Sequence, residues 1–474
     1  MQIKKTEYFR TAGELNNQQI NSQYSYAERR EMGKKLRDVC PRTSHATWQP
    51  PEGRPDPVSL VEKADERRVP ELLALRHGRM AKSAFTFYRG GALNMATDLA
   101  NTPVSGIRVQ CCGDAHLCNF GGFATPERQI IFSINDLDET LPAPWEWDIK
   151  RLAASFMVAS RDNGFSKADA KDTVLTCVRS YREWMSEFSM MKTLERWYFA
   201  LYSDMLISGI KDPDVRRRVI KRLSKESGKS VAEDLYPKLV NSEGGSEFIK
   251  DQPPTIFHWK DHKPGEVDDF VINSYNNYQK SLVPAYSNLL NSYQLKDAAL
   301  KVVGVGSVGT ACWVLLLTAN NANKDPLFLQ VKEARASVLE PFAGKSRFGN
   351  DGERIVNGYR SMQPYSDILL GWTTGEMDSR HYFVRQLRDI KISARVETFS
   401  PAVMDIYASW CGWALALSHS RSGDSAMISG YLGKSDTFDK AIAAFSVSYA
   451  DQNEQDHNSI IRAIRNGKLE AVSE

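Results

Sequence analysis

A glycine-rich run between two strand-like segments constrains the fold of this chain more than any other feature. The run Gly304-Val305-Gly306-Ser307-Val308-Gly309 has the G-x-G-x-x-G spacing that two unrelated nucleotide-binding folds share. In a dinucleotide-binding turn these glycines open a helix, whereas residues 310–318 are rich in Cys, Trp, Val and Leu and predict a strand. A glycine loop between two strands lets backbone N–H groups approach phosphates. We therefore predict a loop that covers the phosphates of a nucleotide, with four binding residues: Gly304, Gly306, Ser307 and Gly309.

A polar loop in the first quarter of the chain carries the candidate reaction chemistry. In the run from Gly113 to Phe120, Asp114 and Asn119 have the D-x-x-x-x-N spacing of a phosphotransfer catalytic loop. The run resembles the Gly-Asp-Leu-His-x-x-Asn loop of aminoglycoside and choline phosphotransferases, with His116 at the matching position. This resemblance implies that Asp114 is the base, that His116 is a catalytic-loop residue and that Asn119 binds Mg²⁺. The alternative is an ordinary polar turn, in which Gly and Asp are common.

A strand predicted over residues 129–134 delivers an acidic segment to the same region. Asp136 lies 17 residues after Asn119 (136 minus 119) and begins the run Asp-Leu-Asp-Glu. The run resembles the strand-end aspartate segment of the same enzymes, in which the aspartate holds Mg²⁺ against the phosphates. It implies Asp136 as the second metal ligand, with Asp138 as a further ligand and Glu139 as an alternative. The competing interpretation is a solvated acidic turn.

Two further positions, Ser133 and Asp148, can be compared with those of the aminoglycoside and choline phosphotransferases. Ser133 departs from the pattern, because an acidic residue is expected before the Asn-Asp pair. The segment from Pro144 to Leu152 resembles the one that opens a helix in these enzymes. It implies that Asp148 accepts backbone N–H bonds from the catalytic loop, although an ordinary helix N-cap explains the residue almost as well.

The strand after the glycine loop carries a lysine. Lys332 lies one strand and one turn after Gly309, and its surroundings resemble the Val-Ala-Ile-Lys strand whose lysine holds the nucleotide phosphates in kinases. This position relative to the glycine loop favours a catalytic and phosphate-binding role for Lys332. The alternative is a solvated lysine at the edge of a strand. An acid on the next helix is expected to pair with Lys332, and the two candidates are Glu353 and Glu340.

A further predicted strand, residues 382–387, is expected to lead into a hinge. Backbone groups of Gln386 and Leu387 would then meet the edge of the adenine. The alternative for the flanking Arg385 and Arg388 is that they are simple surface charges.

The order of these segments is rotated relative to that of a kinase. The glycine loop begins 191 residues after Gly113 (304 minus 113), whereas a kinase has its glycine loop first. This order, with the Phe87-Tyr88-Arg89-Gly90 and Val384–Asp389 stretches, resembles an uncharacterised bacterial family with a kinase-like fold. The resemblance covers about residues 65–450. It implies a circularly permuted, two-lobe protein-kinase-like fold of the α/β (α+β) class that binds ATP and Mg²⁺. Arg89 is either a phosphate or substrate contact or a tie to the acidic turn.

Periodicity and composition suggest four regions. Residues 1–65 are polar and predict an extended, loosely packed arm. Residues 66–295 are expected to hold the catalytic-loop segment and a mainly helical large lobe, and residues 296–392 a small β-rich nucleotide-binding lobe. Residues 393–474 predict helices that complete the large lobe.

Bulk properties exclude several classes of function. With 61 basic and 58 acidic residues the net charge is +3, too small for an electrostatic nucleic-acid binder. No apolar stretch approaches the ~20 residues of a transmembrane helix. The seven cysteines include no CxxC pair, so we expect free thiols in a cytoplasmic protein without a membrane partner.

The expectation is therefore an ATP-dependent phosphotransferase that acts on the hydroxyl of a small molecule. A protein kinase acting on a protein substrate, an AMP transferase and a catalytically silent ATP-binding regulator are the alternatives on the same fold. An oxidoreductase built on the glycine loop requires a helix directly after Gly309.

Overall fold

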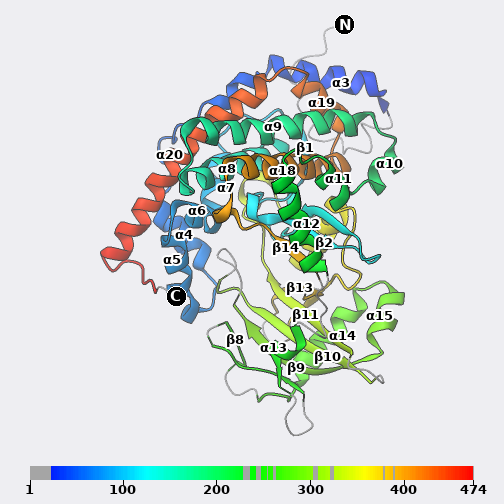
Figure 1. Cartoon of the computed structure of the whole chain (residues 1–474). Coiled ribbons are helices and arrows are strands. Elements are labelled where there is room, and N and C mark those ends of the chain that lie inside the picture. The colour runs from blue at the N-terminus through cyan, green and yellow to red at the C-terminus, as the bar shows by residue number, and fades with distance from the viewer. Residues whose placement is uncertain are drawn as a thin grey trace.

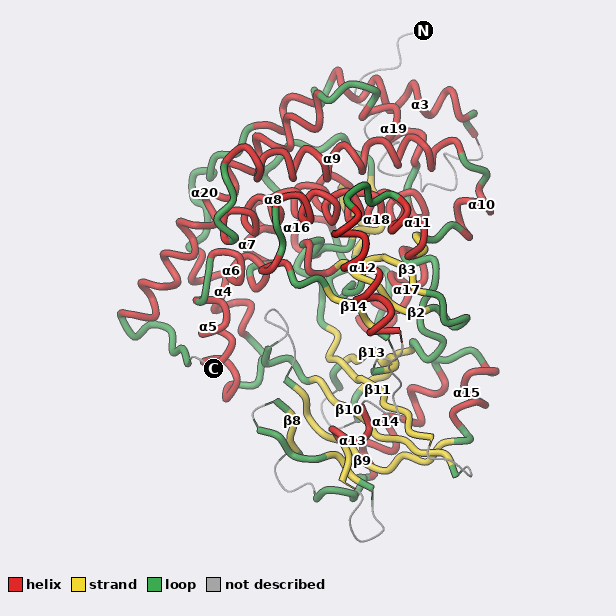
Figure 2. Tube along the Cα trace, viewed as in Figure 1, coloured by secondary structure: helices red, strands yellow, loops and turns green. Residues whose placement is uncertain are grey.

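Helices and strands occupy different parts of the molecule (Figure 1). The computed structural model describes residues 23–227, 235–241, 247–253, 255–259, 263–302, 308–320, 325–376, 379–387 and 390–472. Most helices gather at one end, and a six-stranded sheet with a few helices forms the other end (Figure 2). The predicted mixture of helices and strands is confirmed.

Helices from the beginning, the middle and the end of the chain build the helical part. They are α3 (Tyr26–Lys35), α4 (Pro57–Asp65), α5 (Leu73–Ala81), α6 (Ala84–Gly90), α7 (Ala92–Leu99), α8 (Trp145–Asp162), α9 (Lys167–Met190), α10 (Thr193–Tyr198), α11 (Ser203–Ser208), α12 (Pro213–Ser227), α18 (Pro401–Ser422), α19 (Ser425–Leu432) and α20 (Thr437–Arg465). Helix α18 packs along α9, where the rings of Trp184 and Trp413 stack with their centroids 3.8 Å apart. Segments more than 200 residues apart in sequence therefore share one hydrophobic core.

Short antiparallel strands inside the helical part carry the polar loop and the acidic segment. One pair joins β1 (Arg108–Cys111) to β4 (Leu141–Pro144), and a second sheet has the order β14-β2-β3-β5. Its strands are β14 (Lys391–Ser393), β2 (Phe120–Ala124), β3 (Ile130–Ile134) and β5 (Leu201–Tyr202). The chain passes from β1 through residues 112–119 into β2, and from β3 through residues 135–140 into β4. Both polar segments are consequently held at strand ends.

The large sheet is antiparallel, with the strand order β12-β13-β11-β10-β9-β8. Its strands are β8 (Ile256–Phe257), β9 (Tyr293–Lys301), β10 (Cys312–Ala319), β11 (Asp325–Ala334), β12 (Gly371–Thr374) and β13 (His381–Gln386). Helices α16 (Glu340–Ala343) and α17 (Asp351–Met362) lie between β11 and β12 in sequence. Because a strand, β10, begins three residues after Gly309, the helix that a dinucleotide turn needs is not there.

The segment before β9 differs from its predicted place in the helical lobe. It contains α13 (Tyr236–Leu239), β6 (Val240–Asn241), β7 (Phe248–Ile249), α14 (Asp269–Lys280) and α15 (Pro284–Leu290). Tyr278 of α14 packs with Leu315 and Leu317 of β10, and its hydroxyl donates to the carbonyl of Leu369 at 2.6 Å. Apolar residues of these helices thus cover the large sheet, so this region belongs with the sheet.

Residues 23–65 also differ from the extended arm that their polar composition predicted. Helix α3 packs against α19, and the backbones approach so closely that only glycine fits. A Cβ atom at Gly33 would lie 2.0 Å from the carbonyl oxygen of Met427, and one at Gly430 would lie 2.0 Å from that of Arg30. Arg54 then forms ion pairs of 2.7 Å with Asp98 and 2.6 Å with Asp456. Polar residues of this segment therefore form contacts with distant parts of the chain instead of only with water.

We predict that Gly430→Ala destabilises the folded chain, because the methyl group would collide with the backbone of α3. Overpacking of this kind costs about 1–3 kcal/mol in the free energy of unfolding, which urea denaturation measures. Gly349→Ala is the matched control, since a Cβ atom there meets nothing within 4 Å. Equal midpoints for the two variants would show that α3 and α19 do not touch at Gly430.

A buried histidine fastens the segment before α14 to the large sheet. The ring nitrogens of His258 lie 2.8 Å from an oxygen of Asp251 and 3.1 Å from one of Asp297. Burial acts to lower the pKa of His258, but its hydrogen bonds to Asp297 and Asp251 outweigh burial and raise the pKa above 6.5. The folded state therefore binds this proton more tightly than the unfolded state.

The stabilisation by His258 is complete below pH 6.5 and is lost as the pH rises through the folded-state pKa. We expect His258→Gln to lower the melting temperature more at about pH 6 than at about pH 9. Thermal denaturation of both chains at the two pH values measures the difference. A pH-independent difference would mean that His258 is neutral in the folded protein.

Candidate active site

A cavity of about 830 Å³ lies between the large sheet and the strand ends of the helical part. Of the residues predicted for the site, its wall contains Asn119, Asp136, Lys332, Gln386 and Leu387. Seven further charged side chains stand among the apolar and uncharged polar residues of the wall. They are Arg89, Arg128, Lys301, Asp367, Arg385, Lys391 and Glu397. The excess of basic groups suits a polyanionic ligand.

The polar loop is shaped by a glycine and a buried aspartate. Gly113 has a φ of 83°, and a Cβ atom there would lie 2.3 Å from the carbonyl oxygen of Glu139. Asp148, near the start of α8, accepts the backbone N–H groups of Cys112 at 2.6 Å and Gly113 at 3.0 Å. This is the structural role that the resemblance implied for Asp148. Nε2 of His419 lies a further 3.1 Å from Oδ2 of Asp148, so the carboxylate is held on three sides.

Asp114 and Asn119 are held by contacts within the helical part. The carboxylate of Asp114 accepts hydrogen bonds from the guanidinium of Arg151, which is buried in α8, with an N–O distance of 2.5 Å. Its other oxygen lies 3.8 Å from Nε2 of His116. The amide nitrogen of Asn119 donates to the backbone carbonyl of Asp114 at 2.8 Å, so the amide oxygen is the atom left to bind a cation.

Lys332 reaches the acidic segment from the large sheet. Its ammonium lies 2.5 Å from Oδ2 of Asp138 and 3.8 Å from Oδ1 of Asp136. The other oxygen of Asp138 and Oδ1 of Asp136 are buried without a hydrogen-bond partner among the described residues. The carboxylate of Glu139 accepts the backbone N–H of Val338 at 2.7 Å and does not pair with Lys332. Two acidic residues of the segment therefore share one cation and keep spare acceptor oxygens.

The charges in this cluster shift one another's protonation. Burial acts to raise the pKa of Asp136, but the charges of Lys332 and Arg385 outweigh burial and lower the pKa. Burial and the neighbouring Asp136 raise the pKa of Asp138 to about 6. Burial acts to lower the pKa of Lys332, and the two carboxylates more than compensate and raise it. At neutral pH the cluster thus holds an ammonium between two carboxylates.

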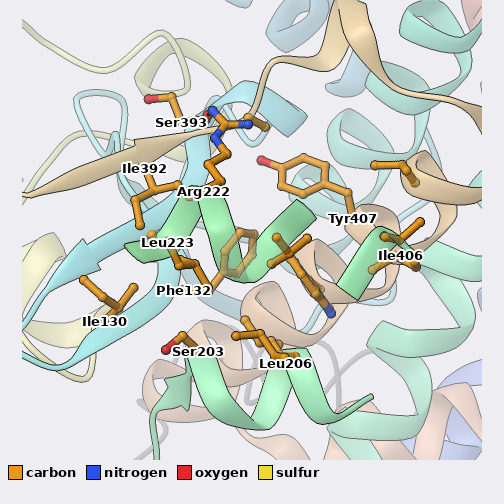
Figure 3. A pocket seen from close by; sticks show the side chains of 18 of the residues that line it. Ile130, Phe132, Ser203, Leu206, Arg222, Leu223, Ile392, Ser393, Ile406 and Tyr407 are labelled. Atoms are coloured by element: carbon orange, nitrogen blue, oxygen red, sulfur yellow. The ribbon is translucent and has the colours of Figure 1, made fainter. Parts of the chain in front are cut away.

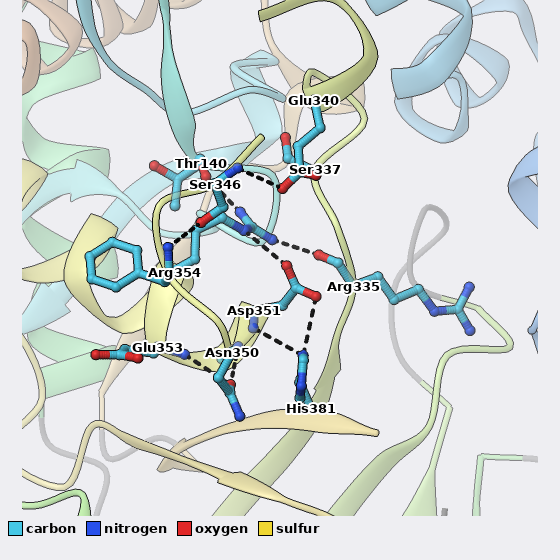
Figure 4. A network of polar contacts seen from close by, with 12 residues as sticks. Thr140, Arg335, Ser337, Glu340, Ser346, Asn350, Asp351, Glu353, Arg354 and His381 are labelled. Atoms are coloured by element: carbon cyan, nitrogen blue, oxygen red, sulfur yellow. Dashed lines mark hydrogen bonds and ion pairs between the residues drawn. The ribbon is translucent and has the colours of Figure 1, made fainter. Parts of the chain in front are cut away.

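The predicted acid partners of Lys332 do not contact it. Glu353 lies in the first turn of α17, and Glu340 accepts the backbone N–H of Ser346 (Figure 4). Helix α17 instead contributes Arg354, which donates to the carbonyls of Asp138, Thr140 and Arg335. The helix therefore binds the backbone of the acidic segment, and the acidic segment itself supplies the partners of Lys332.

The nucleotide-binding residues are placed only in part. Gly304, Gly306 and Ser307 lie outside the described residues. Gly309 has a φ of 83°, and its carbonyl accepts the N–H of Val69 at 2.8 Å, so the end of the loop is fastened to the helical part.

The predicted hinge carries its own hydrogen bonds. The N–H of Gln386 donates to the carboxylate of Asp367, and the N–H of Leu387 donates to the carbonyl of Phe328 at 2.8 Å. Both N–H groups are thus engaged within the protein, and the contact of this segment with adenine stays a prediction. Their side chains still line the cavity.

Sequence reasoning missed the arginines that organise the site. Arg151 follows Asp148 by one helical turn, so a helix opening with Asp-x-x-Arg was the available signal. Arg385 is a wall residue rather than a surface charge, and it contacts the hydroxyl of Tyr359 at 3.0 Å and the carbonyl of Asn135 at 3.3 Å. No local pattern predicts these partners, because they come from other elements.

A second cavity, of about 130 Å³, lies beneath β2 and β3 (Figure 3). Apolar side chains of α11, α12 and α18 line it, among them Leu206, Leu223 and Ile406. Arg222 at its edge bonds to the carbonyl of Ser393. Without a carboxylate, imidazole or thiol in its wall, this cavity cannot carry out the chemistry of the larger one.

Residues 68–463 match the model of a family described as an uncharacterised protein conserved in bacteria, DUF2252. The chain belongs to this family. The match spans 396 of the 474 residues (463 minus 68, plus 1) and includes every candidate site residue. No curated protein and no solved structure matches this DUF2252 chain. None of its described helices is long and apolar enough to cross a membrane.

We predict that Asp148→Ala destabilises this DUF2252 protein, because two buried N–H groups lose their acceptor. Each unsatisfied buried group costs about 1–3 kcal/mol, so the free energy of unfolding should fall by about 2–6 kcal/mol for the two. Asp162→Ala, at the exposed end of the same helix, is the matched control. Denaturation midpoints compare the two, and a loss no larger than that of the control would contradict the assigned role.

Proposed function

We propose that this protein is an ATP-dependent phosphotransferase that moves the γ-phosphoryl group to the hydroxyl of a small molecule. The observation that carries the proposal is the meeting of Asn119, Asp136 and Lys332 in the wall of one cavity, with Asp138 paired to Lys332. These residues come from segments separated by almost 200 positions in the sequence. Phosphoryl transfer needs this set of groups: oxygen ligands for Mg²⁺ and a cation for the phosphates.

The residues present suit Mg²⁺ and a nucleotide. Oδ1 of Asp136 and Oδ1 of Asp138 are buried and accept no hydrogen bond from the described residues, and Asn119, whose amide oxygen is available, lines the same cavity as Asp136. Carboxylate and amide oxygens are the ligands that Mg²⁺ prefers, and the bound ion would neutralise charge on the phosphates. Lys332 would bind the phosphates, since its charge is retained by the two carboxylates.

Asp114 would accept the proton of the acceptor hydroxyl as the new oxygen–phosphorus bond forms and the bond to ADP breaks. Its position supports this role, because Arg151 binds one oxygen and fixes the direction of the other. We also propose a two-lobe kinase-like architecture. In its support, the strand that carries Lys332 is the third of the run β9, β10 and β11, and helix α17 follows it.

A second candidate is a catalytically silent ATP-binding regulator. It is favoured by the pairing of Lys332 with Asp138 instead of with an acid of α17, because active kinases pair this lysine with a helix glutamate. Phosphoryl transfer to a protein and transfer of AMP use the same residues and stay alternatives.

Isothermal titration of Mg²⁺ and ATP tests the proposal, with the wild-type chain and Asp136→Asn compared at neutral pH. We expect magnesium-dependent binding that the substitution weakens about tenfold or more, equivalent to about 1.4 kcal/mol. Asp214→Asn, a highly exposed position, is the matched control and should bind as the wild type does.

Several outcomes would count against the site. Absence of ATP binding at millimolar ligand would overturn the proposed nucleotide site. NADH is titrated as a control ligand, and binding of NADH instead of ATP would favour the dinucleotide interpretation. Binding of ATP without any turnover over a range of hydroxyl compounds would favour the silent regulator.

A further inference from the structure

One cation in the wall of the larger cavity has no hydrogen-bond or ion-pair partner among the described residues. Arg89 makes no hydrogen bond or ion pair with any described residue, and its Nε atom is buried. A buried donor without an acceptor destabilises the folded state, so such a group is expected to meet a ligand. The other arginines discussed at the site, Arg151, Arg354 and Arg385, all have acceptors within the protein.

Arg89 does not tie its helix to the acidic segment, which was one of the two interpretations of this residue. It lies on α6, one turn after Phe85, and this i,i+4 spacing puts both side chains on one face of the helix. The guanidinium lies 6.0 Å from the centroid of the Phe85 ring, and both residues line the cavity. Helix α6 thus presents an apolar ring and an unpaired cation to the site.

The charges around Arg89 place it beside the polar loop rather than beside the phosphate-binding lysine. Burial lowers the pKa of His116 to about 4, and the charge of Arg89 contributes to the lowering. The charge of Arg89 also acts on Cys118. At Asp136 the main charges are those of Lys332, Arg385 and Lys391. Arg89 is therefore near the loop that carries Asp114, the proposed base for the acceptor.

We propose that Arg89 binds an anionic group of the phosphoryl acceptor, so that the acceptor is a hydroxylated carboxylate or phosphate ester. This inference rests on the proposed function, whose nucleotide would occupy the Lys332 side of the cavity. A guanidinium forms paired hydrogen bonds with either anion, and Phe85 packs against the carbon chain. Cationic acceptors such as aminoglycosides and choline would be repelled by an unpaired arginine.

Calorimetric titration tests the acceptor class on the full chain saturated with Mg²⁺ and a non-hydrolysable ATP analogue. The probes are glycerate, glycerol 3-phosphate, glycerol and choline, so that the two anions distinguish a carboxylate from a phosphate requirement. We expect one of the anions to bind about tenfold or more tightly than glycerol or choline. Arg89→Met should remove this preference, and Arg89→Lys should restore part of it, while affinity for the ATP analogue stays unchanged.

Arg465→Met, at the exposed end of α20, is the matched control and should keep the preference. Choline or glycerol binding as well as the anions, or anions binding equally to Arg89→Met, would overturn the inference. If the wild-type chain does not bind the ATP analogue, the phosphotransferase proposal fails. The same anion titrations on the nucleotide-free chain then still decide whether Arg89 is an anion site.

Discussion

The contact of Lys332 with Asp136 and Asp138 joins the large sheet to the helical part. Charges removed from water lose several kcal/mol of solvation each, and only close opposite charges compensate for that loss. Removing one member of such a buried cluster leaves an uncompensated charge and typically costs about 3–5 kcal/mol. Arg354 reinforces the same junction through backbone carbonyls of the acidic segment. The shape of the cavity therefore depends on these ionic contacts together with the hydrophobic core, which includes Ala334 and Phe383 of the large sheet.

Features that depend on short spacings could be read from the sequence. The strand after Gly309 follows from the β-branched and apolar residues of β10, and the position of Asp136 follows from the strand before it. Asp148 was recognised because its segment resembles a known helix opening, and the structure gives it the implied N–H contacts. Lys332 and the polar loop likewise reach one cavity. Local sequence was sufficient where one element positions the residue.

The sequence did not show which side chains pair with one another when the partners lie on different elements. Glu353 and Glu340 carry carboxylates as Asp138 does, and only the placement of α17 and α16 in the fold keeps them from Lys332. The N-terminal residues are polar, and their composition does not show that Arg54 binds Asp98, 44 positions later, and Asp456, 402 positions later. The helices between 236 and 290 have apolar faces that fit either core, so periodicity did not assign them to the sheet.

The close packing of α3 on α19 and of Arg54 on Asp456 has a consequence for the order of folding during synthesis. The helical part is assembled from segments before and after the sheet, whereas strands β8 to β13 come from one continuous stretch. Domains fold as units while the chain emerges from its N-terminus. The large sheet is thus complete on the ribosome before α18 to α20 exist. Until those helices are made, the partners of α3 and Arg54 are missing, and the apolar faces of α8 and α9 stay uncovered and available to chaperones.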